Sequence, residues 1–525
     1  MNSIACRSLL ALCLAFAGAL CDAKTLRWSA RGDALSMDPY AHNEGVTNNI
    51  NALLYDRLVE LDRDLKIVPA LATQWEVVND RTWRFHLRRD VKFQDGTPLT
   101  ADDVVFSIER SQQPSSQHGV FTRRLGKAVR VDDHTIELRQ DSPNPLLLEN
   151  ALNTYVMSRA WCVANKVERV PNSNDKEEAY SSNRAMGSGA WILKAREPGV
   201  RTVLVRNRNH WRAFEGNVDE VAYTPIANDA TRTAALISGD IDFTQEIAPQ
   251  DVDRLAQHPQ IRVTTGVENR VIFFGFDQER DELLYSSVKG RNPFKDVRVR
   301  EAFFHAVDTG LLMSKVMRGQ SVPTACMTMA AVGCHASELE VRGGPDVNRA
   351  RQLMADAGYA NGFELTLDCP NDRYVNDQAI CVAMGSMLAR IGVVLKVQTR
   401  SKSLYFPKVL KHDTSFYMYG WGGNLTDAQF VFDPLLHSVD AKTQKGGDNI
   451  GRIADPDLDR MIDAAGVEMN VGRRTQLIRD ALRRIHAQHY TLPIHRPMLT
   501  WVSRANVHVI IMAGNTVRVD WIRID

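Results

Sequence analysis

Hydrophobic and polar residues alternate along the first half of the chain with a period that changes from segment to segment. Residues 25–30 and 82–87 alternate with a period of two, which is typical of strands with one buried face. Residues 48–58 repeat their apolar positions with helical spacing instead. A second helix is expected to begin at Thr100, whose hydroxyl can accept hydrogen bonds from the first-turn amides. This half therefore predicts a mixed α+β lobe.

The pattern changes near residue 296, where helices begin to alternate regularly with strands. A helix expected at 379–391 separates strands expected at 363–368 and 393–398, and such alternation is typical of parallel sheet. We therefore predict an α/β fold with a compact second lobe, whose C-terminal tail beyond about residue 499 returns to the first lobe. Other strands are expected at 135–138, 202–206, 270–276, 416–420, 500–503 and 517–522, and other helices at 229–237, 249–256, 297–306, 346–357 and 471–489.

The N-terminus has the order of features found in a secretory signal. One cation, Arg7, precedes an apolar stretch at 8–20, which is shorter than the ~20 residues of a membrane-spanning helix. Compact residues follow, so we expect a signal peptide at 1–23, cleaved after Ala23, and a periplasmic location. Lipidation at Cys21 is the alternative, which the bulky Leu20 disfavours. We expect no membrane span in the rest of the chain.

Composition narrows the class of function. The 525 residues include 64 Lys and Arg against 63 Asp and Glu, and this balance provides no field for nucleic acid. The length exceeds what one hydrophobic core usually supports, so two or more cores are expected. The chain contains no HExxH, GxSxG or phosphate-binding glycine loop. We therefore predict a protein without catalytic activity, cofactor or metal.

Five cysteines follow the expected signal peptide. Cys326 lies near Cys334 and Cys369 lies near Cys381, and an oxidising compartment permits a disulfide within each pair. We predict both bridges and expect Cys162 to remain as a buried thiol. The spacing does not match a zinc site.

Several short motifs follow one another in a characteristic order. The longest set covers residues 69–106 and includes the segment Val91-Lys-Phe-Gln-Asp-Gly-Thr-Pro98. Later matches are Gly187-Ser-Gly-Ala190, Ser238-Gly-Asp-Ile-Asp242, Asn292-Pro-Phe294, Asn371-Asp-Arg-Tyr374 and Trp421-Gly-Gly423. Together they resemble the family 5 extracytoplasmic solute-binding proteins, which include the dipeptide, oligopeptide and nickel receptors of ABC importers. The resemblance extends over essentially the whole chain after residue 23.

This resemblance implies a two-lobed periplasmic-binding-protein fold, type II-like and of cluster C, that closes around a ligand by hinge motion. Lobe one is expected at 24–290, with an extra subdomain at about 70–185, and lobe two at 291–499. Residues 500–525 are expected to return to lobe one. The implied partners are a small-molecule or peptide ligand and the permease subunits of an ABC transporter. The protein is expected to be a monomer that binds no nucleic acid.

Trp421 is the main candidate for ligand contact. It follows an apolar strand and is succeeded by Gly422 and Gly423, which would let a ligand approach the backbone, while the indole offers a stacking surface. A core tryptophan beside a tight turn is the alternative. In peptide-binding relatives, an acidic residue three positions after this tryptophan pairs with the ligand's amino terminus. That position here is Asn424, and the nearby Asp427 is a candidate substitute.

Arg373 is the second candidate, because a guanidinium group binds a carboxylate through two parallel hydrogen bonds. In dipeptide-binding relatives the corresponding arginine lies a few residues later, at a position occupied here by Gln378. A solvated loop arginine is the alternative. Tyr374 in the same loop and Tyr405 are further candidates, although Tyr405 could instead pack in the core.

The ligand class remains open among several alternatives. A short peptide is the leading hypothesis, and a nickel chelate, an opine, a glutathione-like thiol and an oligosaccharide are the rivals. His486, His489 and His495 could suit nickel, but histidines near a helix C-terminus also complement its dipole. A secreted hydrolase and a sensor or chaperone that docks on a membrane receptor are the alternatives from other classes.

Overall fold

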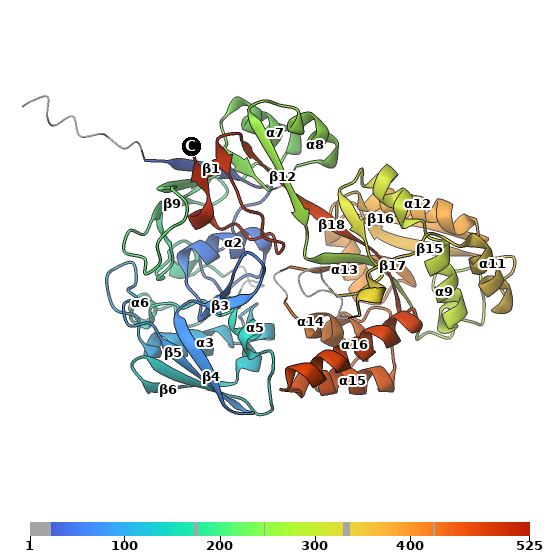
Figure 1. The fold of residues 1–525 in the computed structure, drawn as a ribbon, viewed down its shortest axis with the longest axis horizontal. Helices are drawn as coiled ribbons and strands as arrows, with labels where there is room; N and C mark the ends of the chain where they lie inside the picture. Colours follow the sequence, from blue (N-terminus) through green and yellow to red (C-terminus); the bar gives the residue numbers. More distant parts are fainter. Residues whose placement is uncertain (1–22, 173–176, 246, 329–335, 424–425) are drawn as a thin grey trace, which may run out of the picture.

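The computed structural model describes residues 23–172, 177–245, 247–328, 336–423 and 426–525, and it divides into two lobes (Figure 1). Lobe one contains the chain up to Val267 together with the C-terminal residues from Met498 onward. Lobe two contains the continuous segment 270–496. The buried apolar side chains follow this division, since separate clusters form within lobe one and within lobe two. The expected signal peptide lies outside the described residues, apart from Ala23.

Lobe one is built around β1 (Thr25–Ser29), whose Trp28 is completely buried. Strand β1 pairs in parallel with β10 (Glu220–Tyr223) on one side and with β11 (Phe243–Thr244) on the other. Antiparallel strands β9 (Arg201–Arg206) and β8 (Trp191–Glu197) extend the sheet beyond β10. The cluster around Trp28 also includes apolar residues from the extreme C-terminus, namely Val517, Val519 and Ile522.

A smaller body within lobe one has its own sheet and its own core. The sheet runs in the order β4 (Ala72–Asn79), β5 (Thr82–Leu87), β7 (Thr135–Arg139) and β6 (Lys127–Asp132). Helix α3 (Ala101–Ser111) packs against β6 and is anchored at its start by Asp103, whose carboxylate accepts from the Thr100 amide. The Thr100 hydroxyl donates to the same carboxylate at 3.1 Å, so the acidic residue of the first turn fixes the start of the helix.

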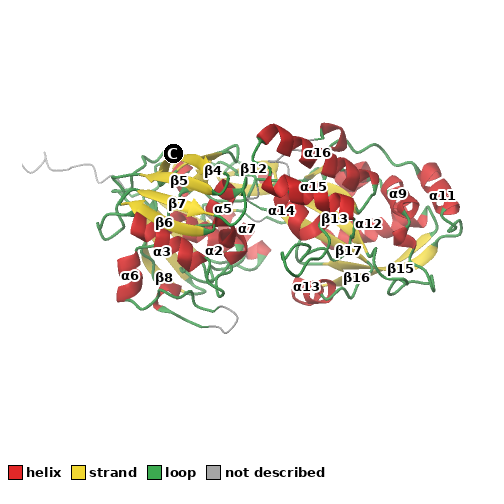
Figure 2. Ribbon diagram, turned by 90° about the horizontal axis from the view of Figure 1, so that it is seen from below, coloured by secondary structure: helices red, strands yellow, loops and turns green. Residues whose placement is uncertain are grey.

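Lobe two is an α/β body of the kind that the alternating pattern predicts. Strand β15 (Phe363–Pro370) pairs in parallel with β16 (Val393–Arg400) and β17 (Phe416–Gly422), and β17 pairs antiparallel with β13 (Arg270–Phe276). Figure 2 shows helices on both sides of these strands. The helices are α9 (Val297–Ala306), α11 (Val347–Asp356), α12 (Asp377–Ala389), α13 (Lys402–Leu410), α15 (Pro456–Val467) and α16 (Val471–Ala487).

Two stretches of chain connect the lobes. The first is the step from β12 (Ile261–Val267) to β13, and the second is β18 (Thr491–Arg504). Strand β18 pairs with β13 through its first residues and with β12 through its last residues, so it belongs to both lobes. Near the crossing it also pairs with β14 (Ser321–Pro323). The lobes can therefore rotate about two neighbouring backbone segments.

Two expected C-terminal strands differ from the structure. The strand expected at 500–503 is the end of the much longer β18. The strand expected at 517–522 is wrong, because the chain forms a 3₁₀ turn at Val519–Trp521 before the short β20 (Arg523–Ile524). Its alternating apolar residues face the lobe-one core without pairing in a ladder.

The remaining helices and strands are α2 (Gly45–Leu54), β2 (Val59–Leu61), β3 (Ile67–Pro69), α4 (Gly119–Thr122), α5 (Leu147–Ala151), α6 (Arg159–Ala164), α7 (Asp229–Ser238), α8 (Pro249–Ala256), α10 (Thr309–Leu311), α14 (Gln429–Val431) and β19 (Val507–His508).

The predicted disulfide between Cys369 and Cys381 is present, and it ties the end of β15 to the first turns of α12. Cys334 lies outside the described residues, so its bridge to Cys326 stays a prediction. Cys162 is buried and free, and burial raises the pKa of its thiol to about 12. Among the helices of the described residues, none has the length and apolarity needed to cross a bilayer.

Candidate ligand-binding cleft

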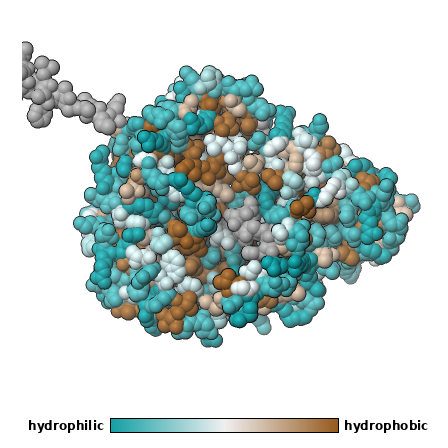
Figure 3. All heavy atoms as spheres, in the orientation of Figure 1, coloured by the Kyte–Doolittle hydropathy of each residue, from teal (hydrophilic) through white to brown (hydrophobic). Residues whose placement is uncertain are grey.

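A cleft of about 1850 Å³ lies between the lobes and extends to the strands that connect them. Its walls come from both lobes, so a molecule inside it would contact both at once. On the face shown in Figure 3, hydrophilic residues cover much of the surface, and several apolar patches lie near the junction of the lobes. The volume is larger than that of a typical drug-sized pocket, which is ~300–1000 Å³.

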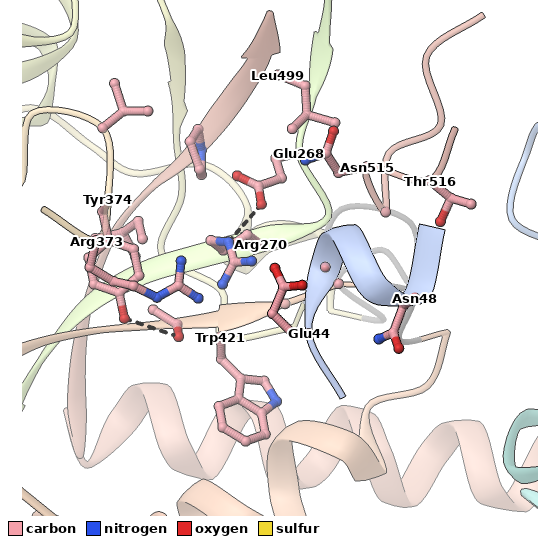
Figure 4. Close-up of a pocket in the computed structure, with 18 of the residues that line it drawn as sticks. Glu44, Asn48, Glu268, Arg270, Arg373, Tyr374, Trp421, Leu499, Asn515 and Thr516 are labelled. Atoms are coloured by element: carbon pink, nitrogen blue, oxygen red, sulfur yellow. Dashed lines mark hydrogen bonds and ion pairs between the residues drawn. The ribbon is translucent and has the colours of Figure 1, made fainter. Parts of the chain in front are cut away.

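The lobe-one wall includes the start of α2 and the C-terminal return of the chain. Glu44, which immediately precedes α2, and Asn48 on α2 face the cleft opposite residues of lobe two (Figure 4). The Glu44 carboxylate caps α2 by accepting from the amides of Val46 and Thr47 at 3.1 and 3.0 Å. Asn515 and Thr516 also lie on this wall (Figure 4). Lobe one contributes charged residues to the cleft as well, among them Arg57 and Arg124.

Trp421 lies at the end of β17 and forms part of the lobe-two wall. Its indole nitrogen donates to the carbonyl oxygen of Phe430 at 2.7 Å, and its ring lies nearly parallel to that of Tyr419 with centroids 6.5 Å apart. The indole donor is therefore used within the protein, and the ring face is what remains for a ligand. Trp421 is half-buried, packs against the lobe-two core and lines the cleft, and its contact with a ligand stays a prediction.

Gly422 and Gly423 line the cleft beside Trp421, where they approach the connection between the lobes. A Cβ atom on Gly422 would lie 2.2 Å from the carbonyl oxygen of Asn269, so no larger residue fits there. Asn269 also donates through its side chain to the Gly423 carbonyl at 2.8 Å. This turn of the cleft wall is thus fastened to Asn269, one of the two residues between β12 and β13.

Arg373 and Tyr374 lie on the loop between β15 and α12, which the Cys369–Cys381 disulfide closes at its base. The Asp377 carboxylate fixes this loop by accepting from the amides of Arg373 and Tyr374, each at 3.0 Å. The Arg373 guanidinium lies over the Tyr374 ring at 5.1 Å and has no ion-pair partner among the described residues. The Arg373 side chain therefore extends from a fixed loop into the cleft (Figure 4).

Arg270 is a cleft residue that the sequence analysis missed. It begins β13 and pairs with Glu268 at 2.7 Å, and the side chains of both are 16% exposed. Burial disfavours the charge on Arg270, but the adjacent carboxylate outweighs it and raises the pKa. The charged pair directly before an apolar strand was the signal that could have indicated a cleft position.

Two candidates, Tyr405 and Asp427, lie away from the cleft wall. Tyr405 is completely buried on α13, and its hydroxyl donates to the Met418 carbonyl, so it belongs to the core. Asp427 is buried, and Arg474 binds both of its carboxylate oxygens at 2.6 and 2.7 Å. This carboxylate is already neutralised and does not line the cleft. Asn424 lies outside the described residues.

A second set of contacts joins the lobes away from the connecting strands. Arg124 of lobe one pairs with Asp433 of lobe two at 2.7 Å, and the rings of Phe121 and Phe430 meet edge to face at 6.1 Å. Figure 1 shows that α5 of lobe one lies opposite α14 of lobe two in this region. On α5, Glu149 is desolvated and lies near the Asp427 charge, which together raise its pKa to about 7. We call these residues the interlobe contacts.

The C-terminal histidines pack with aromatic rings. His486 and His489 lie 5.6 and 5.0 Å from the Phe304 ring, measured between centroids, and burial lowers the pKa of His489 to about 3. His495 is buried within β18. Within the described ranges, no group of three histidine, cysteine or acidic side chains could hold a metal ion.

Comparisons with known proteins identify a family. The model of bacterial extracellular solute-binding proteins, family 5, matches residues 66–443. The periplasmic murein peptide-binding protein MppA of Escherichia coli is 26% identical over 467 residues, covering 84% of this chain and 82% of the relative. Heme-binding protein A of Haemophilus influenzae is also 26% identical, over 486 residues that cover 88% of this chain and 85% of the relative.

Solved structures share the fold over nearly the full chain. The unliganded open form of MppA superposes with a TM-score of 0.77 at 23% identity, covering 96% of this chain and 98% of that chain. HbpA2 of Haemophilus parasuis gives a TM-score of 0.80 at 19% identity, covering 95% and 100%. The predicted two-lobed periplasmic-binding-protein fold is therefore confirmed.

Proposed function

Because the chain belongs to family 5 of the bacterial extracellular solute-binding proteins, we propose that it captures a short peptide or peptide-like solute for an ABC importer. The cleft with walls from both lobes is the observation that carries this proposal. Its volume suits an extended ligand of several residues. Relatives named for peptides, including the oligopeptide-binding protein OppA of Escherichia coli at 24% identity, support the ligand class.

Capture follows from the geometry of the two lobes. A solute that touches both walls stabilises the closed arrangement, because the open arrangement offers only one wall at a time. Rotation occurs about the β12–β13 step and β18, while each lobe keeps its own core. Trp421 contributes its ring face to the lobe-two wall, and Arg373 and Tyr374 contribute their side chains to the same wall. The solute is handed to the permease chemically unchanged.

Several further features belong to this proposal. The protein is exported through a signal peptide at residues 1–23 and acts in the periplasm as a monomer without catalytic activity. Its functional units are lobe one, which the return segment at 500–525 completes, and lobe two. The family and its periplasmic relatives support the location, and the partners are the permease subunits of the transporter.

A second candidate is a receptor for a solute without a free amino group, such as an opine. Arg474 occupies the Asp427 carboxylate, and the sequence has a neutral amide at Asn424, so neither supplies a free acid for a ligand amine. A solved relative with 21% identity and a TM-score of 0.74 holds agropinic acid. This candidate keeps the same cleft and the same transport role.

A thermal-shift screen of the purified mature protein separates these candidates. Di- to tetrapeptides are expected to raise the melting temperature, since a ligand that binds only the folded form stabilises it. Mass spectrometry of solutes that co-purify provides an independent identification. A rise with opines, hemin or nickel–histidine and with no peptide would replace the peptide proposal.

A further inference from the structure

The lobe-two wall of the cleft contains a carboxylate without a cationic partner. Asp448 precedes α15 and lines the cleft, and its side chain is half-buried. One of its oxygens accepts from the Tyr419 hydroxyl at 3.1 Å, and the carboxylate makes no ion pair within the described ranges. Asp433, by contrast, pairs with Arg124 and Lys445. A negative charge on the cleft wall is therefore left for the solute to neutralise.

The electrostatics of Asp448 agree with this geometry. Burial raises its pKa, and the hydrogen bond from the Tyr419 hydroxyl opposes that rise. Removing a carboxylate from water is costly unless a counter-charge or several donors replace the lost hydration. One neutral donor compensates only part of this cost. A cation carried by the solute would therefore gain a strong contact here.

Aromatic rings line the cleft together with this carboxylate. The rings of Tyr419 and Trp421 are nearly parallel with centroids 6.5 Å apart, and Phe406 meets the Tyr419 ring edge to face at 5.9 Å. All three residues line the cleft, as Asp448 does. Aromatic faces attract cations, and they also pack against the alkyl stems of long basic side chains. Figure 4 shows the Trp421 ring apart from the Arg373 side chain, so this aromatic wall is separate from that cation.

We propose that Asp448 and the rings of Phe406, Tyr419 and Trp421 form a subsite for a basic side chain of the solute, of the lysine or arginine type. The alkyl stem packs against the rings, and the ammonium or guanidinium group donates to the second oxygen of Asp448. The amino end of a peptide has no such stem to cover the rings, so the aromatic wall favours a side chain. This inference rests on the proposed function and narrows it to solutes that carry a basic side chain.

The test uses pairs of alanine tripeptides that carry either lysine or norleucine at the first, second or third position. Norleucine keeps nearly the same stem and lacks the charge. Calorimetry on the purified mature protein is expected to show at least ~10-fold tighter binding of the lysine peptide at one of the positions, because a hydrogen bond between charged groups is lost in the norleucine peptide. Asp448→Asn should reduce this preference to less than about threefold, because it removes the charge and keeps the shape.

Matched variants separate the subsite from general effects of charge or stability. Glu364→Gln removes a lobe-two carboxylate that pairs with Lys396 at 3.2 Å and does not line the cleft, so it should leave the preference unchanged. Phe406→Leu keeps an apolar side chain without the ring and should reduce the preference roughly 2- to 5-fold. Asp448→Glu keeps the charge and should retain part of the preference. The melting temperature of Asp448→Asn without ligand should match that of the unaltered protein, since its amide oxygen still accepts from Tyr419.

The outcomes distinguish this inference from the proposed function. Equal binding of lysine and norleucine peptides at every position would overturn the subsite while leaving peptide capture intact. The preference for lysine should persist when both peptides of the pair are N-acetylated. Loss of the Asp448-dependent preference on acetylation would assign this carboxylate to a main-chain amine and overturn the side-chain subsite.

If no peptide of either series binds, the peptide proposal fails, and the subsite is tested by thermal shift with agmatine and cadaverine. Stabilisation by these cations that Asp448→Asn abolishes would uphold a subsite for a basic group. Absence of any stabilisation, or equal stabilisation of the variant, would overturn it.

Discussion

Replacing Arg124 with glutamine removes the ion pair that holds the two lobes together opposite the connecting strands. Among the described residues, the ion pair and the hydrogen bond of the Arg124 side chain are both made with Asp433. Glutamine keeps much of the length and polarity of the side chain but carries no charge. The change therefore acts on closure and leaves the core of each lobe intact.

The expected magnitude follows from the exposure of the pair. Arg124 is 42% exposed and Asp433 is 10% exposed, so the pair is screened by water on one side. Such a pair contributes about 0.5–1 kcal/mol, which corresponds to a roughly 2- to 5-fold fall in the ratio of closed to open protein. When the ligand-free protein is mainly open, the apparent dissociation constant rises by the same factor.

Single-molecule fluorescence transfer between one dye on each lobe measures the closed fraction directly, and calorimetry measures ligand affinity. Arg349→Gln is the matched control, since Arg349 pairs with Glu301 at 3.3 Å within lobe two. The effect of Arg124→Gln should shrink in 1 M salt, where the screening length is ~3 Å. An unchanged closed fraction at low salt, or an equal change in the control, would refute the reasoning.

Three further predictions concern the cleft and its supports. The Glu149 pKa lies near 7 rather than 4.5, so the closed form is favoured below pH 4.5, where Glu149 is protonated, and this preference is lost as the pH rises to 7. Glu149→Gln should flatten this pH dependence of the closed fraction. An unaltered pH profile in the variant would contradict the role of Glu149. Replacing Cys369 and Cys381 with alanine should lower the free energy of unfolding by ~3 kcal/mol in denaturant titrations and weaken ligand binding, because the loop between β15 and α12 would no longer be closed. An unchanged free energy of unfolding would contradict this role of the disulfide. Trp421→Ala should weaken binding by at least ~1 kcal/mol in calorimetry, and unchanged affinity would remove Trp421 from the site.

Local signals explain which elements could be predicted from the sequence. The strand at 82–87 and the helix at 297–306 have the predicted bounds, because strict alternation defines the first and an Asp296 cap begins the second. Residues 517–522 also alternate, but no neighbouring strand offers them a ladder, so tertiary packing overrides the local pattern. Periodicity therefore indicates which side chains are buried, whereas the presence of a neighbouring strand decides whether the backbone forms a β-strand.

The candidate site residues likewise divide into those whose position the sequence indicated and those whose position depends on tertiary structure. Trp421 and Arg373 line the cleft, and their contact with a ligand stays a prediction. Tyr405 was a candidate because aromatic residues suit ligand walls, yet α13 directs it into the core. Arg270 was missed because its exposure to the cleft depends on where β13 meets β12 and β18, which are far apart in sequence. The charged pair before the apolar strand is a local signal, but long-range pairing decides whether that pair faces the cleft.

The discontinuity of lobe one has a consequence for biogenesis. Its core needs Val517 and Ile522, and the side chain of Lys24 donates to the carbonyl oxygen of Ile524 across 500 residues of sequence. Lobe two is one continuous segment, 270–496, so all of its residues have been synthesised before the last residues of lobe one. Because contacts between distant residues form slowly, lobe one should complete last, only after the ribosome has released the whole polypeptide. Truncation by even ten residues should therefore damage the N-terminal body more than the central one.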